Sequence, residues 1–247
     1  MVFAHGLGCD QTMWRLIAPA FADEHKVVLF DHVGSGGSDR SAYRQARYQS
    51  LLGYADDMLQ LCEALNLRNS IFVGHSVSAM IGVLAANRAP ERFSKLIMLG
   101  PSPRYLDDEG YVGGFTRRDI DDLLQIMSLN YVEWSKQMAV AAMACPDRPI
   151  LANELVDSFS KADPFIMRHF AEVTFLSDTR EELPKCRIPT LILQCQNDIV
   201  VPLAVGEYLQ RMLPNSRRVL MRATGHYPQL SAPDETIRAF RDFIGTE

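Results

Sequence analysis

The chain has 247 residues and a formal charge of −5 at pH 7, with 47% hydrophobic and 22% charged residues. These values are ordinary for a folded globular protein and argue against a disordered or low-complexity chain. The acidic balance gives no reason to expect nucleic acid or an anionic membrane surface as a partner. No apolar run approaches the roughly 18 residues that a membrane helix needs.

The five cysteines are scattered along the chain, and no pair has the C-x-x-C spacing of a zinc or redox site. No His, Cys, Asp or Glu cluster has metal-ligand spacing either, so neither a metal nor a cofactor is expected. The first residues, MVFAHGLGCD, lack the basic-then-apolar order of a signal peptide. We therefore expect reduced thiols and a cytoplasmic location, unless a leader precedes these residues.

Six short apolar runs predict strands that are buried on both faces of a parallel sheet. They cover residues 2–4, 26–31, 70–74, 95–99, 190–195 and 218–221. Amphipathic or small-residue helices are expected at residues 51–65, 77–88 and 233–244. Strand and helix in alternation predict an α/β fold with right-handed crossovers.

The strand pattern stops between about residue 101 and residue 183. Helix-like segments replace it at residues 118–129, 131–143, 150–161 and 164–175. An insertion of about 80 residues is too long for a loop, so we expect a helical lid over one end of the sheet. An extra helical layer without a functional role is the alternative. The expected division is a core domain from residues 1–101 and 184–247, with the lid at 102–183.

The stretch SIFVGHSVSAMIG sets an apolar strand, a tight turn and a small-residue helix in succession. This is the context of a nucleophile elbow, which raises Ser76 above the strand ends at a helix N-terminus. The turn needs small residues two before and two after the nucleophile, and Gly74 and Ser78 meet that need. The helix dipole favours negative charge at this point. We predict that Ser76 is a nucleophile rather than an ordinary turn serine.

A serine nucleophile needs a base, and the base needs an orienting acid. His226 lies in a turn-rich loop after the last strand, and Asp198 directly follows a buried strand. The order Ser76, Asp198, His226 is the order of nucleophile, acid and base in α/β hydrolases. A turn-forming role is the alternative for Asp198, but no rival acid follows the strand 95–99 before Asp107.

An oxyanion hole is expected where the first strand runs into the loop His5-Gly6-Leu7-Gly8. In this fold such a loop donates one backbone N–H, and the residue after the nucleophile donates the other. The predicted donors are therefore the N–H groups of Leu7 and Val77. A simple turn between strand and helix is the alternative. The glycine-rich segment 34–38 lacks the lysine and spacing of a phosphate-binding loop, and it predicts a tight structural loop.

The remaining histidines have plainer interpretations. His75 neighbours the nucleophile, and we expect its side chain to be structural. His25 and His169 are expected at the surface or on the lid. His32 is expected to be a loop residue, with a place at the pocket entrance as the alternative.

Six segments carry a resemblance to a known family: HGLGCDQTMW, FDHVGSGGSD, GHSVSAMIG, GPSPRYLDDEGYVGGF, LILQCQNDIVVP and GHYPQLSAPDET. Together they resemble the RsbQ-type α/β hydrolases, which include bacterial stress-signalling hydrolases and the plant strigolactone and karrikin receptors. The resemblance covers almost the whole chain. It implies a triad of Ser76, Asp198 and His226, a serine two residues after the nucleophile, a four-helix lid, and a small apolar pocket between lid and core.

The chain departs from the family pattern in two places. Leu7 stands where family members often have Phe, which bears on the shape of the ligand at the pocket mouth. Family members usually have a β-hairpin before the first strand found here. Without one, the strand 26–31 becomes an exposed edge that can pair with a second chain. A leader before residue 1 is the alternative.

The preferred interpretation is a carboxylesterase-like serine hydrolase that cleaves small apolar esters or lactones through an acyl-enzyme on Ser76. The rival is a small-molecule sensor, in which slow turnover moves the lid so that a signalling protein docks. Hydrolysis of C–C bonds or perhydrolysis on the same scaffold is a further enzymatic alternative. Apolar lid residues are candidates for the pocket but are equally explained as lid core: Trp134, Met138, Phe159, Phe165 and Met167.

Overall fold

The computed structural model describes residues 1–245. Within them, six parallel strands form one sheet in the order β2-β1-β3-β4-β5-β6. The strands are β1 (Val2–Ala4), β2 (Val28–Phe30), β3 (Ser70–His75), β4 (Phe93–Leu99), β5 (Thr190–Cys195) and β6 (Ser216–Met221). Each run that was expected to be a strand contains one, so the prediction of a parallel α/β sheet is confirmed.

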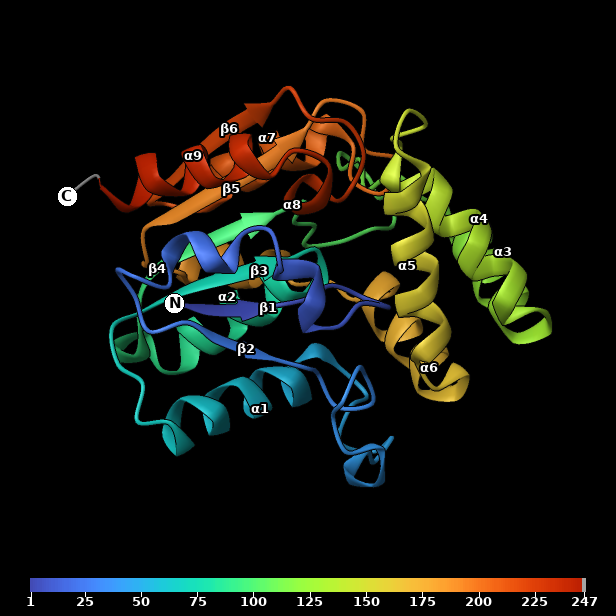
Figure 1. The fold of residues 1–247 in the computed structure, drawn as a ribbon, viewed down its shortest axis with the longest axis horizontal. Coiled ribbons are helices and arrows are strands. Elements are labelled where there is room, and N and C mark those ends of the chain that lie inside the picture. Colours follow the sequence, from blue (N-terminus) through green and yellow to red (C-terminus); the bar gives the residue numbers. More distant parts are fainter. Residues whose placement is uncertain (246–247) are drawn as a thin grey trace.

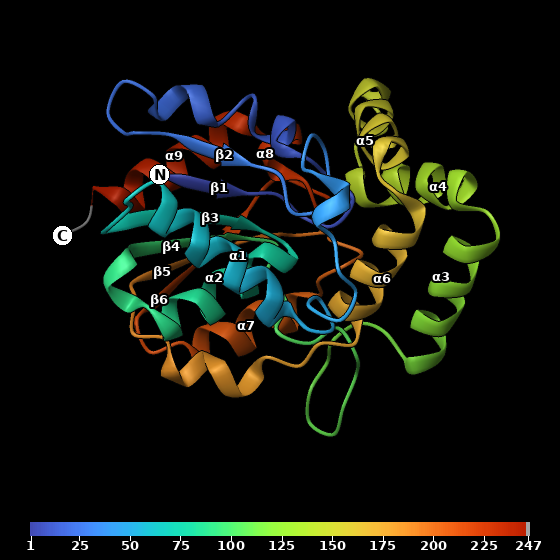
Figure 2. The ribbon, with the colours of Figure 1, turned by 90° about the horizontal axis from the view of Figure 1, so that it is seen from below.

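Helices cover both faces of this sheet. On one face lie α1 (Leu51–Ala64), α2 (Val77–Arg88) and α7 (Leu203–Met212), and on the other lies α9 (Pro233–Ile244) (Figures 1 and 2). The shorter elements are α8 (Pro228–Ser231) and the 3-10 helices η1 (Gln11–Trp14), η2 (Ala18–Phe21), η3 (Arg40–Ala42), η4 (Pro90–Arg92) and η5 (Arg180–Lys185). Residues 1–245 include no helix with the length and apolar composition to cross a membrane.

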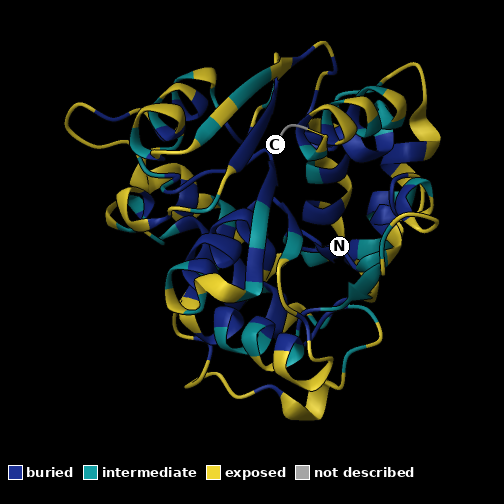
Figure 3. Ribbon diagram, turned by 90° about the vertical axis from the view of Figure 1, so that its left-hand side faces the viewer, coloured by how far each residue is buried: buried dark blue, intermediate teal, exposed yellow. Residues whose placement is uncertain are grey.

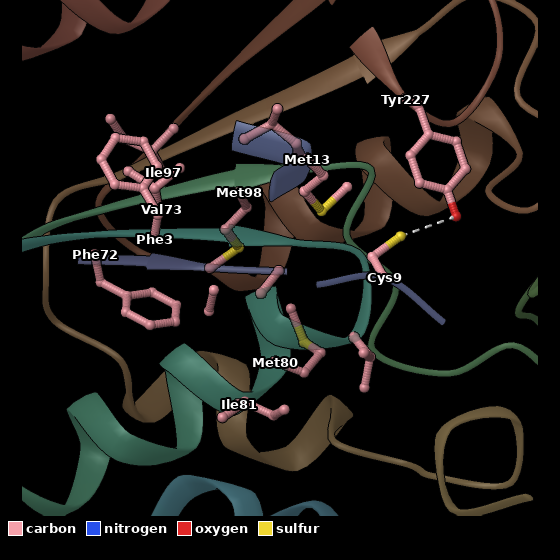
Figure 4. Packing of buried hydrophobic residues seen from close by; sticks show 14 of the residues in the cluster. Phe3, Cys9, Met13, Phe72, Val73, Met80, Ile81, Ile97, Met98 and Tyr227 are labelled. Atoms are coloured by element: carbon pink, nitrogen blue, oxygen red, sulfur yellow. Dashed lines mark hydrogen bonds between the residues drawn. The ribbon is translucent and has the colours of Figure 1, made fainter. Parts of the chain in front are cut away.

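Helix α2 is the most deeply buried helix of the core, as its small-residue sequence predicts. All its residues from Val77 to Ala86 are buried, and Figure 3 shows the burial concentrated at the middle of the sheet. Met80 and Ile81 pack with side chains of β1, β3 and β4 (Figure 4). Gly82 permits this approach, because a Cβ there would lie 2.3 Å from the ring of Phe72. The close packing holds the N-terminus of α2 at the end of β3.

Four helices form a group at the carboxyl ends of the strands (Figure 1). They are α3 (Arg117–Leu129), α4 (Tyr131–Met143), α5 (Pro149–Lys161) and α6 (Pro164–Phe175). Their starts follow local capping chemistry: Thr116 and Asp119 form a capping box at α3, and Asp163 accepts from the first turn of α6. The division of the chain at residues 102 and 183 stays a prediction, and its second boundary falls within η5.

Helix α7 was not predicted from the sequence. Its residues include Gly206, which lowers helix propensity by about 1 kcal/mol relative to alanine. The glycine is required by packing, since a Cβ at this position would lie 1.9 Å from Oε1 of Gln194 on β5. A tertiary contact therefore explains why the local pattern was weak.

Strand β2 forms one edge of the sheet, as expected from the sequence. It pairs with β1, and within residues 1–245 no strand pairs with its outer side. Val28, Leu29 and Phe30 are each half-buried. An unpaired strand edge of this kind exposes backbone N–H and C=O groups that can pair with another chain.

Candidate active site

The predicted site residues come from loops that follow four different strands. Leu7 follows β1, Ser76 follows β3, Asp198 follows β5 and His226 follows β6. In a parallel sheet the carboxyl ends of the strands lie at one edge, so these loops meet there. This edge faces the four lid helices (Figure 1).

Ser76, His226 and Asp198 form one continuous chain of hydrogen bonds. The Oγ of Ser76 lies 2.8 Å from Nε2 of His226, and the Nδ1 of His226 lies 2.6 Å from Oδ2 of Asp198. A carboxylate can only accept, so Nδ1–H donates to Asp198, and Nε2 is left to accept the serine proton. All three side chains are buried. The structure thus brings together the three residues that the sequence selected, although 150 positions separate Ser76 from His226.

Ser76 has the strained backbone of an elbow, with φ 55° and ψ −123°. A residue other than glycine in such a conformation costs about 1–3 kcal/mol and needs surrounding contacts to hold it. The N–H of Ser76 donates to the carbonyl of Leu99 at 2.8 Å, and its own carbonyl accepts from Ala79 at 2.9 Å. Gly74 leaves the necessary space, because a Cβ there would lie 2.7 Å from the backbone of Ser78.

Asp198 is held by its own turn as well as by the histidine. Its Oδ1 accepts from the N–H groups of Val200 at 2.8 Å and Val201 at 3.2 Å, which leaves Oδ2 for His226. The two interpretations of Asp198, as a turn former and as an orienting acid, therefore apply to different oxygens of one carboxylate. Gly100 lies close to the ring of His226, and it must be a glycine because a Cβ there would lie 2.9 Å from Cε1 of His226.

Both predicted oxyanion donors are free in the structure. Among residues 1–245 the backbone N–H groups of Leu7 and Val77 donate to no other group. Val77 is the first residue of α2, where helical N–H groups have no intrahelical partner. Leu7 borders the same cavity as Ser76. Two free donors beside a nucleophile are what a tetrahedral oxyanion requires.

His75 was expected to be structural, and in the structure it directly contacts the loop that carries His226. Its Nε2–H donates to the carbonyl of His226 at 2.8 Å, and the two rings lie 4.8 Å apart. Burial, and then the charge of His226, hold the pKa of His75 well below its usual range, so the ring is neutral. On the other side a Cβ at Gly6 would lie 2.5 Å from Nδ1 of His75. His75 therefore lies between the loop of the base and the loop of Leu7.

His32 is a buried network residue rather than an ordinary loop residue. Ser78 Oγ donates to the carbonyl of His5 at 2.5 Å, so the Nε2–H of His32 must be the donor in its 2.7 Å contact with that oxygen. Burial holds the pKa of His32 well below its usual range. Ser78 thereby joins β1, the loop after β2 and α2, which a glycine at this position could not do.

His169 was expected at the surface or on the lid. It lies on α6 of the lid and is buried. Its Nδ1 is hydrogen-bonded to the hydroxyl of Tyr43. His25 is half-buried. Neither of these two histidines borders the cavity at Ser76.

A cavity of about 40 Å³ lies between the triad and the lid. Ser76 and His226 form part of its wall, and the lid contributes Trp134, Met138, Ala142, Phe159, Thr174 and Phe175. Three of the five candidate lid residues therefore border it. Phe165 is 63% exposed, and Met167 is buried elsewhere.

Two polar atoms of this lining have no partner. Trp134 Nε1 on α4 and Thr174 Oγ1 on α6 are buried without a hydrogen bond to any group in residues 1–245. A helical threonine can bond the carbonyl four residues back, here that of Phe170, but Thr174 does not. An unsatisfied buried polar group costs about 1–3 kcal/mol. These atoms are therefore available to a ligand.

A larger hollow of about 610 Å³ lies away from the triad, bordered by α1, α6 and η5. Its carboxylates already have cationic partners; Glu172, for example, lies 3.1 Å from Arg168. No group of three or more His, Cys, Asp or Glu side chains within residues 1–245 is arranged to hold a metal ion.

This geometry agrees with the comparisons with known proteins. A model of the α/β hydrolase fold family matches residues 1–233. The chain belongs to the α/β hydrolase family. It is 39% identical to a strigolactone esterase of Arabidopsis thaliana over 242 residues, which cover 98% of this chain and 90% of that protein. It is 38% identical to a karrikin insensitive receptor of Petunia hybrida over 238 residues, which cover 96% and 88% of the two chains.

Solved structures agree. A hydrolase from Oleispira antarctica superposes with a TM-score of 0.96 at 37% identity, covering 100% of this chain and 90% of that one. The predicted kinship with the RsbQ-type hydrolases is therefore confirmed, and so is the expected class of an esterase-type α/β hydrolase.

Proposed function

We propose that this protein is a serine esterase that cleaves small apolar esters or lactones through an acyl-enzyme on Ser76. The observation that carries the proposal is the buried hydrogen-bond chain from Ser76 Oγ through His226 to Asp198, beside two free backbone donors. A serine hydroxyl, a base that can accept its proton and an acid that orients the base are sufficient for acyl transfer.

In acylation, Nε2 of His226 takes the proton of Ser76 while Oγ attacks the ester carbonyl. The N–H groups of Leu7 and Val77 hold the resulting oxyanion. The intermediate collapses when the protonated His226 gives its proton to the departing alcohol oxygen. Asp198 keeps Nδ1–H oriented and balances the charge of the imidazolium.

In deacylation, His226 removes a proton from water, and the hydroxide attacks the acyl carbonyl. The bond to Ser76 Oγ breaks, and Oγ recovers a proton from His226. The carboxylic acid leaves, and the starting state returns. For a lactone, acid and alcohol are the two ends of one product.

The cavity supports a small substrate. At about 40 Å³ it is far smaller than the hollow of about 610 Å³ elsewhere on the protein. Its walls are largely apolar, and Trp134 and Thr174 add two donors without partners. A lactone or a short ester that carries one further oxygen fits this combination. A larger substrate requires the lid helices to move apart.

The sensor function is the second candidate, because lid residues border the cavity at the buried Ser76 and His226 and a relative is named as a receptor. In this form of the proposal slow turnover shifts the lid, and a signalling protein then docks on it. Steady multiple turnover of 4-nitrophenyl acetate and butyrate is the result expected of the esterase. A burst of one equivalent that then stalls would favour the sensor.

The esterase proposal is tested by labelling with phenylmethylsulfonyl fluoride, followed by peptide mass spectrometry. We expect one adduct, on Ser76, with loss of turnover in proportion to labelling. The variant Ser76→Ala is expected to form no adduct and to show no turnover. Turnover that persists in Ser76→Ala would remove the acyl-enzyme from the mechanism.

Two further proposals concern partners and location. Pairing of two chains through the open edge of β2 would give a dimer, which light scattering would detect. A strict monomer would contradict this proposal.

The proposed cytoplasmic location rests on the cysteines, all five of which are free thiols. Neither nucleic acid nor a membrane is proposed as a partner.

A further inference from the structure

Tyr105 reaches the candidate active site from the loop after β4, which has no sequence motif of a catalytic loop. It follows β4, is 1% exposed and borders the cavity at Ser76. Its ring packs edge-on against Phe175 of α6 at 5.0 Å, and its carbonyl accepts from the N–H of Phe115 at 3.1 Å. The side chain is thus fixed between the core and the lid.

The hydroxyl of Tyr105 lies 3.4 Å from Oγ of Ser76, its only hydrogen-bond partner among residues 1–245. The serine proton points to Nε2 of His226 at 2.8 Å, so the phenol is the donor to the serine oxygen. Burial raises the pKa of Tyr105 well above its usual range, and the nearby charge of Asp198 adds to this. The phenol therefore keeps its proton at neutral pH and remains a donor.

The sheet order shows which side of the serine the phenol occupies. β3 lies between β1 and β4, so the loop of Leu7 approaches Ser76 from one side and the loop of Tyr105 from the other. The side of Tyr105 is also that of His226 and Asp198, since β5 pairs with β4. The loop of the Leu7 donor and the loop of the phenol are thus on opposite sides of the nucleophile. The Tyr105 hydroxyl is therefore placed to donate a hydrogen bond to Oγ of Ser76 rather than to the carbonyl oxygen of the substrate.

We propose that Tyr105 is a catalytic residue whose hydroxyl stabilises negative charge on Ser76 Oγ, both when this oxygen attacks and when it leaves. The inference rests on the proposed esterase function. In acylation the serine proton passes to His226 while Oγ bonds to the carbonyl carbon, and the phenol hydrogen bond strengthens as Oγ gains charge. In deacylation the C–Oγ bond breaks, its electron pair returns to Oγ, and His226 supplies the proton. Tyr105 retains its own proton in both steps.

The test variant is Tyr105→Phe, which removes the hydroxyl and keeps the ring against Phe175. The matched control is Tyr54→Phe, because Tyr54 is also 1% exposed but borders no part of this cavity. The first measurement is the second-order rate constant for inactivation by phenylmethylsulfonyl fluoride, which reports the reactivity of Ser76 with little use of the pocket. We expect it to fall about tenfold in Tyr105→Phe and to change less than about twofold in Tyr54→Phe.

The second measurement separates the nucleophile from the leaving group. Acylation and deacylation rates per titrated site are compared for 4-nitrophenyl acetate and phenyl acetate. Because the phenol contacts Oγ, we expect both steps to slow, and acylation to slow by the same factor for both esters. A defect confined to phenyl acetate would assign Tyr105 to the leaving group and overturn the inference. A change in KM alone, or unchanged rates, would also overturn it.

The failures of the two proposals can be told apart with Ser76→Ala. If Ser76→Ala keeps its turnover, the esterase mechanism fails, whatever Tyr105→Phe does. If Ser76→Ala is inactive and Tyr105→Phe reacts like the wild type, only the role of Tyr105 fails. Thermal unfolding of each variant, together with the titrated site concentration, ensures that the rates refer to folded protein.

Discussion

The sheet edge and the lid form opposite walls of one cavity, but they are built differently. On the sheet side, the polar side chains of the triad have defined partners: Ser76 with His226, and His226 with Asp198. On the lid side the wall is apolar, and its two buried polar atoms, on Trp134 and Thr174, have none. Under the proposed function, this difference assigns the chemistry to the core and the selection of substrate to the lid.

Ser76→Ala provides the most severe test of the core side. We expect kcat to fall by about 10⁶, and His226→Ala to cause a similar loss, because the two act as one unit. The double variant should be little worse than either single one. Steady-state turnover of 4-nitrophenyl acetate measures this. A loss below about tenfold in either variant would remove that residue from the mechanism.

Asp198→Asn should be severe but milder, with a loss of about 10⁴ in kcat. The amide retains an oxygen for Val200 and Val201, so the turn is expected to persist while the charge beside His226 disappears. Equal melting temperatures of variant and wild type would show that the turn is intact. A loss that merely followed a lower melting temperature would assign Asp198 to stability alone.

The histidines around the elbow make the core side sensitive to acid. Burial is the first cause that lowers the pKa values of His5, His32 and His75. Below the unfolded pKa of about 6.5 the unfolded chain binds more protons than the native one, so stability rises with pH and is lost as pH falls. Each histidine contributes a slope of up to about 1.4 kcal/mol per pH unit. Urea unfolding at pH 7 and pH 5 measures this change in the free energy of unfolding. Equal urea midpoints at the two pH values would contradict the prediction.

Met138→Ala tests the lid side, where the pocket should widen while the triad stays in place. We expect the ratio of kcat/KM for 4-nitrophenyl hexanoate over acetate to rise about tenfold, the value of roughly one methylene. The matched control is Val140→Ala on the same helix, since Val140 is 63% exposed. The labelling rate of Ser76 should change in neither variant. If Met138→Ala lowered acetate turnover as much as Asp198→Asn does, the assignment of chemistry to the core and substrate selection to the lid would be wrong.

Thr174→Val should have the smallest effect, and it should raise stability while it weakens substrate binding. Removal of a hydroxyl without a partner is expected to raise stability by about 1 kcal/mol, seen as a higher urea midpoint. The same change should raise KM for substrates with a further oxygen and spare simple alkyl acetates. Thr174→Ser, which keeps the hydroxyl, should behave like the wild type in KM. An increase in KM shared by all esters would point to lost packing instead.

Much of the site could be predicted because its determinants are local. The elbow needs Gly74 and a small residue at position 78 within one turn, and the loops of Asp198 and His226 each follow a strand. The strand runs were apolar enough to locate all six strands. The contacts of His32 with Ser78 and of Tyr105 with Ser76 could not be predicted, because they join residues that are distant in the sequence.

Local sequence alone determined the alternation of strands and helices, the four lid helices and the choice of Ser76, Asp198 and His226. Hydrophobic periodicity, capping residues and turn sterics act over a few residues and are visible in the chain itself. Only the tertiary structure decided that His75 donates to the backbone of His226, that Tyr105 reaches Ser76, and that Trp134 and Thr174 carry polar atoms without partners. Those facts depend on burial and on the packing of distant segments, which remove water and leave each polar atom only the partners that the fold provides.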